Sequence, residues 1–373
     1  MLHGYYTVNN TIFNNKIMAL REGTVTKKQV MWHWHPEYNA VNWTQESLYS
    51  LKEVYKKRAK QLREKYDWIT LAFSGGSDSY TALRSFIDNN IHLDEIFIQW
   101  PIKGSKKYYT PNAKNIETSN IYSEWDLTAK PILKEIEKTH PKIKITVYDW
   151  SDDIFKQEIN DDVLFSSQEN INPGIWCKRE QFISKHEEDT FEKGKKSCIV
   201  YAIDKPRVCV KDNKLYCYFL DIIANNHPWY TPGRTIELFY WNKDCTEVVH
   251  TQCREIYRHL LMNPQMQDFI TWGKNPTNDQ RTVWDNWVRK IVYPDYKNWF
   301  QAKKEYNAIY CETDYWIFQA AKGSRYLQSW QSMVDNFLSS IDKKFIRFDG
   351  NKPLGVHGFV SDFFYIGDLP ENI

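Results

Sequence analysis

The sequence of 373 residues lacks any run of 18 or more apolar residues, the length that a membrane-spanning helix needs. It also lacks a Cys-x-x-Cys pair, and its seven cysteines are an odd number. This pattern fits neither a disulfide framework nor a structural zinc site, so we expect reduced thiols. The first 16 residues hold no apolar core of the kind found in secretory signals. We therefore expect a cytoplasmic protein without a membrane partner.

Net charge is a second property of which the sequence has little. The 49 Lys and Arg residues against 47 Asp and Glu residues leave a formal charge of +2. This balance does not indicate a nucleic-acid partner, although it leaves a local basic surface open. Aromatic residues are plentiful at 16%, with 16 Trp, and can serve core packing or stacking on bases. Core packing is the simpler explanation for most of them.

Short apolar runs alternate with helical patterns in the middle of the chain. The runs predict strands at residues 68–73, 95–100, 143–148 and 198–203. The intervening patterns predict helices at residues 79–89, at 118–139 with a restart at Pro131, and at 178–193. Helices of this length between strands imply right-handed crossovers and a parallel sheet with helices on both faces. The sequence therefore predicts an α/β fold with a doubly wound, Rossmann-like parallel sheet.

The character of the sequence divides the chain into three parts. Residues 1–43 show no sustained period and are interpreted as an N-terminal extension with short strands. Residues 44–235 form the α/β domain, which opens with an amphipathic helix over residues 44–65. Alternation over residues 208–221 predicts a β-hairpin close to the domain boundary. Residues 236–373 are expected to form a mostly helical, aromatic-rich accessory domain.

A glycine-rich hexapeptide follows the first predicted strand and opens the next helix. It consists of Ser74, Gly75, Gly76, Ser77, Asp78 and Ser79. The two glycines allow a tight turn with positive φ, so we expect a β-branched residue at Gly76 to be rejected. Backbone N–H groups and serine hydroxyls would then face a phosphate, and Asp78 could hold magnesium or orient the loop. A Gly-Gly turn capped by Ser79, with no ligand, is the simpler alternative.

Two other phosphate-binding patterns are missing from the sequence. It contains neither G-x-x-x-x-G-K-[ST] nor G-x-G-x-x-G, which disfavours P-loop kinases and dinucleotide dehydrogenases. The Ser-Gly-Gly-x-Asp-Ser loop after a strand instead resembles the PP-loop ATP pyrophosphatase superfamily, whose fold is adenine nucleotide alpha-hydrolase-like. The resemblance implies that residues 44–235 bind ATP and Mg²⁺ with the pyrophosphate portion in the loop. It also implies attack on the α phosphorus by an acceptor, which gives an adenylate and pyrophosphate.

A second resemblance concerns the segments around the fourth predicted strand. Trp176-Cys177-Lys178-Arg179 before a helix, and residues 202–207 at the strand end, resemble PAPS-reductase-like proteins encoded by tailed bacteriophages. The resemblance covers about residues 66–235 and implies the host cytoplasm. Such reductases carry a C-terminal Glu-Cys-Gly-x-His segment, whereas this chain has no cysteine after Cys311. ATP chemistry is therefore favoured over two alternatives, a sulfonucleotide-binding protein and a phage nucleotide-binding protein without turnover.

Residues at the predicted strand ends complete the expected site. We expect Lys205 and Arg207 to face the crevice of the loop and to act with Asp78 in catalysis, clamping the departing pyrophosphate. A solvated charged turn is an equally good explanation for this cationic pair. Three residues are expected to border the adenine, although packing explains such positions as well: Phe73, Gln99 and Trp100.

Several other polar and aromatic residues have weaker interpretations. Asp149 and Asp152 could bind magnesium or a substrate amine, or could belong to a helix cap. His33 and His35 have the spacing of zinc ligands, but no third ligand is apparent in the sequence nearby. A helix around Trp284 could stack nucleic-acid bases, although an amphipathic core helix explains it better. The acceptor, the role of the C-terminal region and the oligomeric state are not specified by the sequence.

Overall fold

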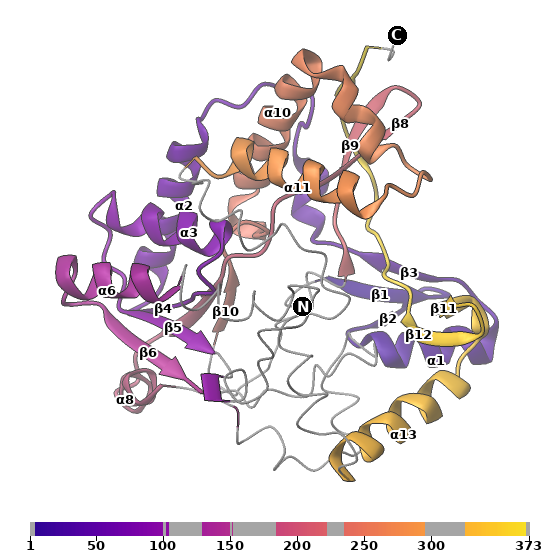
Figure 1. Cartoon of the computed structure of the whole chain (residues 1–373), viewed down its shortest axis with the longest axis horizontal. Helices are drawn as coiled ribbons and strands as arrows, with labels where there is room; N and C mark the ends of the chain where they lie inside the picture. Colours follow the sequence, from indigo (N-terminus) through magenta and orange to yellow (C-terminus); the bar gives the residue numbers. More distant parts are fainter. Residues whose placement is uncertain are drawn as a thin grey trace, which may run out of the picture.

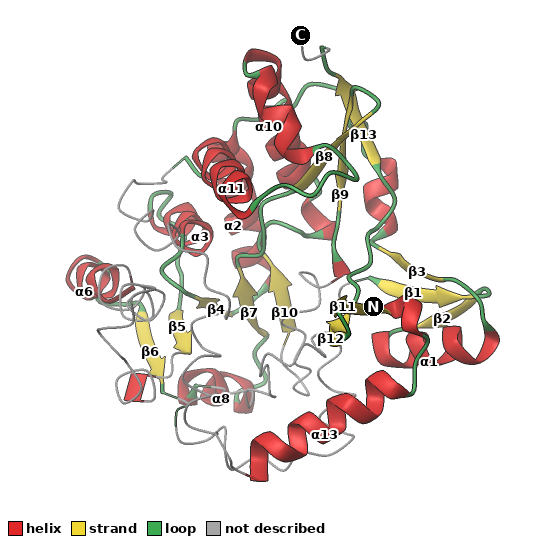
Figure 2. Cartoon of the chain, turned by 45° about the vertical axis from the view of Figure 1, so that its right-hand side comes forward, coloured by secondary structure: helices red, strands yellow, loops and turns green. Residues whose placement is uncertain are grey.

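A parallel sheet of five strands organises the structure, a computed structural model that describes residues 4–99, 102–103, 129–149, 151, 184–221, 235–294 and 325–370. The strand order is β10-β7-β4-β5-β6 (Figure 1, and Figure 2 for β7). All four neighbouring pairs are parallel. The strands are β4 (Trp68–Ala72), β5 (Glu95–Gln99), β6 (Lys144–Tyr148), β7 (Ser197–Tyr201) and β10 (Thr235–Leu238). The predicted parallel sheet is confirmed, and β10 adds a strand that was not predicted.

Helices cover both faces of this sheet. On one side lie α2 (Leu51–Lys65), α3 (Ser77–Ile87) and α6 (Lys130–Thr139), and on the other lies α8 (Lys185–Glu192) (Figure 2). From β4 the chain continues to β5 and β6, and then returns to the opposite side of β4 to form β7. This reversal is the topological switch point of a Rossmann-like α/β fold, which the structure therefore has.

The helix predicted from Thr44 begins later than expected. Helix α2 starts at Leu51, because the Ser50 side chain accepts a hydrogen bond from the N–H of Glu53. The Glu53 carboxylate in turn accepts from the N–H of Ser50 at 2.7 Å, which completes a capping box. The segment before it is held elsewhere, since the Ser47 hydroxyl lies 2.7 Å from that of Thr251.

The N-terminal region contains a helix in addition to the expected strands. Three strands form a sheet in the order β2-β1-β3: β1 (Tyr5–Val8), β2 (Thr11–Phe13) and β3 (Val30–His33). Between β2 and β3 the chain forms α1 (Lys16–Thr26), a helix that the sequence analysis did not predict. Its start is fixed by Asn15, whose side chain accepts from the N–H of Met18 at 3.1 Å. The buried Lys16 forms an ion pair with Asp221 at 2.7 Å, so this helix depends on a distant part of the chain.

The predicted hairpin is confirmed and belongs to a second small sheet. Its strands are β8 (Arg207–Lys211) and β9 (Lys214–Tyr218), and the sheet order is β13-β9-β8. Asp212 and Asn213 both have positive φ, as a two-residue type I′ turn requires. The partner strand β13 (Phe364–Asp368) comes from the end of the chain, so the hairpin and the C-terminal region share one sheet.

The remaining elements follow β10. The α-helices are α10 (Glu247–Met262), α11 (Asn278–Val292) and α13 (Arg325–Ser339), and the last antiparallel pair is β11 (Ile346–Asp349) and β12 (Lys352–Val356). Among the described residues, three short 3-10 helices also follow β10, namely η4 (Lys243–Cys245), η5 (Pro264–Ile270) and η7 (Lys343–Phe345), whereas η1 (Pro36–Ala40) follows β3. Helix α13 lies near α1 (Figure 1). Just beyond α13, the N–H of Asp342 donates to the hydroxyl of Thr24 in α1 at 2.9 Å.

One hydrophobic cluster runs through all three predicted segments. It includes Trp34 near the N-terminus, Leu71 in the central sheet and Val248 in α10. The boundary predicted near residue 235 falls on the first residue of β10, which pairs with β7. Among the described residues, no helix is both long enough and apolar enough to span a membrane.

Candidate functional site

The predicted phosphate loop connects the end of β4 to the start of α3. Gly75 has φ of +78°, a left-handed conformation that glycine adopts without strain. Gly76 has φ of −74° and ψ of 165° and is the N-cap residue of α3. The expectation that positive φ excludes a β-branched residue at Gly76 is therefore wrong, because the left-handed residue of this turn is Gly75.

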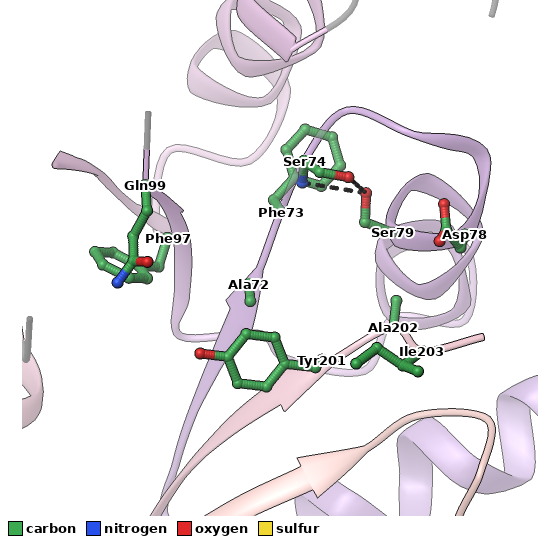
Figure 3. A pocket seen from close by; sticks show the side chains of 10 residues that line it. All are labelled: Ala72, Phe73, Ser74, Asp78, Ser79, Phe97, Gln99, Tyr201, Ala202 and Ile203. Atoms are coloured by element: carbon green, nitrogen blue, oxygen red, sulfur yellow. Dashed lines mark hydrogen bonds between the residues drawn. The ribbon is translucent and has the colours of Figure 1, made fainter. Parts of the chain in front are cut away.

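Hydroxyl groups of the loop hold its own backbone. The N–H of Ser74 donates to the Ser79 hydroxyl at 3.3 Å, and that hydroxyl donates to the carbonyl of Gly76 at 3.2 Å. The N–H of Gly76 donates to the Ser74 hydroxyl, and the two hydroxyls lie 3.3 Å apart (Figure 3). The Ser79 hydroxyl thus accepts from and donates to the backbone of the turn, as expected for a capped turn, and the side chains of the loop stabilise its conformation.

The first turn of α3 presents backbone N–H groups that no side chain caps. Its N-cap residue is glycine, which has no side-chain oxygen to accept a hydrogen bond. Within the described part of the chain, no group accepts from the N–H of Ser77, Asp78 or Ser79. The helix dipole places partial positive charge at the same point. This arrangement suits an anion such as a phosphate.

A cavity of about 200 Å³ lies beside the loop, and we call it the loop cavity. Polar side chains line one part of the loop cavity, and apolar or aromatic side chains line the rest. Around its open centre stand residues from β4 and its loop, from α3, from β5 and from the end of β7: Ala72, Phe73, Ser74, Asp78, Ser79, Phe97, Gln99, Tyr201, Ala202 and Ile203 (Figure 3). Since β4 and β7 flank the switch point of the sheet, the cavity occupies the place where open α/β sheets bind ligands.

Five of the predicted site residues line the loop cavity, namely Phe73, Ser74, Asp78, Ser79 and Gln99. Gly75, Gly76 and Ser77, which form the turn into α3, are not among the described residues that line the cavity. Trp100 lies outside the described residues.

The sequence analysis missed five further lining residues. Ala72, Phe97, Tyr201, Ala202 and Ile203 all lie in or directly after the strands next to the loop. The predicted strand ends at residues 73, 100 and 203 were the signal that could have found them, because neighbouring parallel strands end at one edge.

Asp78 is the one acidic residue among the described residues that line the loop cavity. Its side chain is half-buried at the wall of the loop cavity and forms no ion pair with a described residue. The described residues contain no group of three or more His, Cys, Asp or Glu side chains that could hold a metal. Mg²⁺ is commonly held by one or two carboxylates together with substrate phosphates and water, so a single carboxylate beside the uncapped N-terminus of α3 is compatible with this ion.

Two tyrosines from the part of the chain after β10 lie next to the first turn of α3. The Tyr240 hydroxyl donates to the backbone carbonyl of Asp78 at 2.8 Å. The Tyr293 ring lies 5.5 Å from that of Tyr240, and the Tyr293 hydroxyl is buried without a hydrogen-bond partner in the part of the chain that the structure describes. Burial raises the pKa of Tyr293 well above its usual value, and the charges of Asp78 and Asp204 act in the same direction. Residues that follow β10 thus support the loop.

Lys205 and Arg207 lie at a different cavity from the one predicted. They line a second space of about 490 Å³, which we call the basic cavity, and are not among the described residues that line the loop cavity. The Lys205 ammonium lies 3.3 Å from Asp285 and 3.8 Å from Asp204. The Arg207 Nη2 donates to Asp204 at 2.7 Å. Two carboxylates therefore already neutralise much of the charge that was expected to face the leaving group.

The protonation of this cluster reflects burial and mutual charge. Burial favours a higher pKa for Asp204, but the charges of Lys205 and Arg207 outweigh it and hold the pKa at about 2. Burial lowers the pKa of Lys205, and Arg207 lowers it further, while the two carboxylates oppose this change. The cluster is held together by its own opposite charges.

Other candidates from the sequence play no visible part at the loop. Asp149 accepts from the N–H of Lys103 at 3.1 Å and from the Ser151 hydroxyl at 2.5 Å. His33 lies 2.8 Å from the Thr7 hydroxyl. The helix around Trp284 is α11, which buries Val288 as expected of a core helix. Asp152 lies outside the described residues, as do Cys177, Lys178 and Arg179, which carry the second resemblance.

Two comparisons with known proteins did not identify a family for this chain. A scan against protein-family models gave no match, and a search of curated proteins gave none either.

Proposed function

We propose that this chain binds ATP with Mg²⁺ at the loop cavity and adenylates an acceptor, with release of pyrophosphate. The observation that carries the proposal is the uncapped first turn of α3, which follows Gly75 at the switch point between β4 and β7. Backbone N–H groups and a helix N-terminus at that position are suited to the phosphates of a nucleotide.

The walls of the loop cavity support a purine next to those phosphates. Phe73, Phe97 and Tyr201 supply apolar surface, and the Gln99 side chain offers both a donor and an acceptor to a base edge. The described walls enclose about 200 Å³, which is less than the roughly 300 Å³ of a small ligand site. They therefore match a part of a nucleotide rather than the whole.

Asp78 is the residue to which we assign the magnesium ion. Magnesium bound there would neutralise negative charge on the phosphates of ATP. In the reaction, an oxygen or nitrogen of the acceptor forms a bond to the α phosphorus, and the bond to the bridging oxygen of pyrophosphate breaks. The N–H groups of Ser77, Asp78 and Ser79 would hold the departing pyrophosphate through hydrogen bonds.

The test is to incubate the protein with Mg²⁺, ATP labelled at the α phosphate and fractionated cell extract. We expect labelled AMP or an adenylate together with pyrophosphate, in at least one fraction. Release of ADP and inorganic phosphate would contradict splitting between the α and β phosphates. Tight ATP binding with no product in any fraction would favour the alternative, a phage nucleotide-binding protein without turnover. The hydroxyls of Ser74 and Ser79 already lie 3.3 Å from each other, which is compatible with a loop that binds without reacting.

A further inference from the structure

The basic cavity is larger than the loop cavity and combines positive charge with exposed aromatic rings. It lies between the segment after β7, the hairpin strands β8 and β9, and the chain from η5 into α11. Its volume of about 490 Å³ lies within the range of roughly 300 to 1,000 Å³ that small-molecule sites occupy. Nothing in the ATP chemistry proposed above uses it.

The charges around the basic cavity do not balance. Among the described residues, Lys205, Arg207 and Arg289 pair with two carboxylates, those of Asp204 and Asp285. Lys205 is held at 7% side-chain exposure, so this positive charge is largely shielded from water. One cation of the cluster is therefore left without a described counterion, and an excess positive charge that is partly shielded from water favours a ligand of opposite sign.

Two arginines at the cavity have donors to spare. Arg207 uses Nη2 for Asp204, and its Nη1 has no partner among the described residues. Arg281, at the start of α11, is exposed and forms no ion pair within the described part of the chain. A guanidinium group binds carboxylate and phosphate groups through parallel hydrogen bonds, so these two side chains point to an acidic group on the ligand.

Aromatic side chains form the other part of the wall. Trp272 remains 43% exposed although its ring meets Tyr218 at 5.6 Å and Phe363 at 4.9 Å. Trp284 lines the same cavity from α11. A tryptophan ring that remains in contact with water forgoes the free energy gained by burial, and it offers a flat surface on which another ring can stack.

We infer that the basic cavity binds a small molecule that carries both a flat ring and an acidic group, either a carboxylate or a phosphate. The ring contacts Trp272 and Trp284, and the acidic group contacts Arg207 and Arg281. A cationic ligand is disfavoured because Asp285 is already engaged by Lys205 and Arg289. Interpreting this ligand as the acceptor of the adenylate rests on the proposed function, whereas its binding does not.

The test is isothermal titration of the full chain with four probes. 4-Hydroxybenzoate and uridine 5′-monophosphate each combine a ring with an acidic group, and they distinguish a carboxylate from a phosphate. Uridine supplies a ring without the charge, and inorganic phosphate supplies the charge without a ring. We expect at least one combined probe to bind at least tenfold more tightly than uridine and inorganic phosphate. If neither combined probe does so, the inference is wrong.

Variants place the binding in the basic cavity. Arg281→Gln should weaken the combined probe about tenfold, since a hydrogen bond to a charged group is worth about that factor. Lys290→Gln removes the same charge from the same helix at an exposed position outside the cavity walls and should leave binding unchanged. Equal affinities in these two variants would overturn the assignment.

Trp272→Leu tests the contact with the ring. It should weaken the combined probe and leave the weak binding of inorganic phosphate unchanged. Loss of both to the same extent would contradict stacking. ATP is titrated separately into each protein, so that a failure of ATP to bind is distinguished from a failure of the probe to bind. Thermal melts verify that each variant is folded.

Discussion

The Tyr240 hydroxyl donates to the backbone carbonyl of Asp78 at 2.8 Å and thereby joins the segment after β10 to the first turn of α3. The two residues are 162 positions apart in sequence. The carbonyl that Tyr240 holds belongs to the residue to which we assign magnesium, so a residue beyond the predicted domain boundary helps to orient the proposed site.

Tyr240→Phe should remove the hydrogen bond to the Asp78 carbonyl while leaving the aromatic ring packed in the core. Loss of the hydrogen bond should lower the free energy of unfolding by about 1 kcal/mol and weaken ATP binding measurably. Urea unfolding and calorimetric titration with ATP and Mg²⁺ measure the two effects. Tyr216→Phe serves as the control, because its ring packs against Phe363 and Tyr365 in the small sheet, away from the loop. If both variants bind ATP equally well, Tyr240 does not position the loop.

Gly75→Ala should affect both stability and nucleotide binding. Alanine at φ of +78° costs roughly 1 to 2 kcal/mol, and a distorted turn should misplace the N–H groups of α3. Gly194→Ala is matched in backbone conformation, with φ of +69° and nothing within 4 Å of an added Cβ. Both variants should unfold at lower urea concentration, and only Gly75→Ala should lose ATP affinity. Normal affinity in Gly75→Ala would remove the loop from the site.

Asp78→Asn should leave the fold intact and abolish pyrophosphate release, because it removes the carboxylate proposed to hold Mg²⁺ while keeping the side-chain shape. ATP binding should lose its dependence on Mg²⁺. Asp88→Asn, at the other end of the same helix, where Asp88 pairs with Arg84, should behave as wild type. The measurements are product release from labelled ATP and titrations with and without the metal. Undiminished turnover in Asp78→Asn would show that this carboxylate has no catalytic role.

Lys205→Met should act mainly on stability. The buried ammonium offsets Asp204 and Asp285, and removal of one partner from a buried ion pair commonly costs about 3 kcal/mol. Lys274→Met removes an exposed cation, paired with Asp268, at the rim of the same basic cavity and should cost less than about 1 kcal/mol. Chemical unfolding of both variants measures the difference. Equal, small losses would mean that Lys205 is a solvated charge rather than a buried one.

Acid should destabilise the protein through Glu237 in β10. Burial favours a higher pKa for this carboxyl, but Arg58, Lys65 and Tyr66 outweigh burial and hold the pKa at about 2, below the usual 4.5. The carboxylate therefore stabilises the fold above pH 4.5, and this contribution disappears as the pH falls through about 2. Since one pKa unit corresponds to about 1.4 kcal/mol, roughly 3 kcal/mol is at stake.

The measurement is urea unfolding between pH 6 and pH 2 for wild type and Glu237→Gln. The variant should be less stable at pH 6 and should lose less stability on acidification. A parallel decline of both proteins would show that other carboxyl groups control acid stability.

The parallel sheet and the loop could be predicted because they depend on local sequence. Buried strands such as β4 and β5 consist of short apolar runs, and the loop carries its glycines and serines in consecutive positions. The Asp-Asn turn of the hairpin is equally local, since both residues tolerate positive φ. In each case the side chains that determine the conformation are neighbours in the chain.

Only the tertiary structure decided which residues share a site. Lys205 follows β7 only two residues after Ile203, yet Ile203 lines the loop cavity and Lys205 lines the basic cavity. The direction that Lys205 takes is set by Asp285 on α11, 80 residues away in sequence, at 3.3 Å. Helix α1 likewise depends on the pairing of Lys16 with Asp221. By itself the sequence determined local conformation and the chemistry available at the loop, whereas long-range charge pairing and burial, which no local pattern encodes, determined where each polar side chain is used.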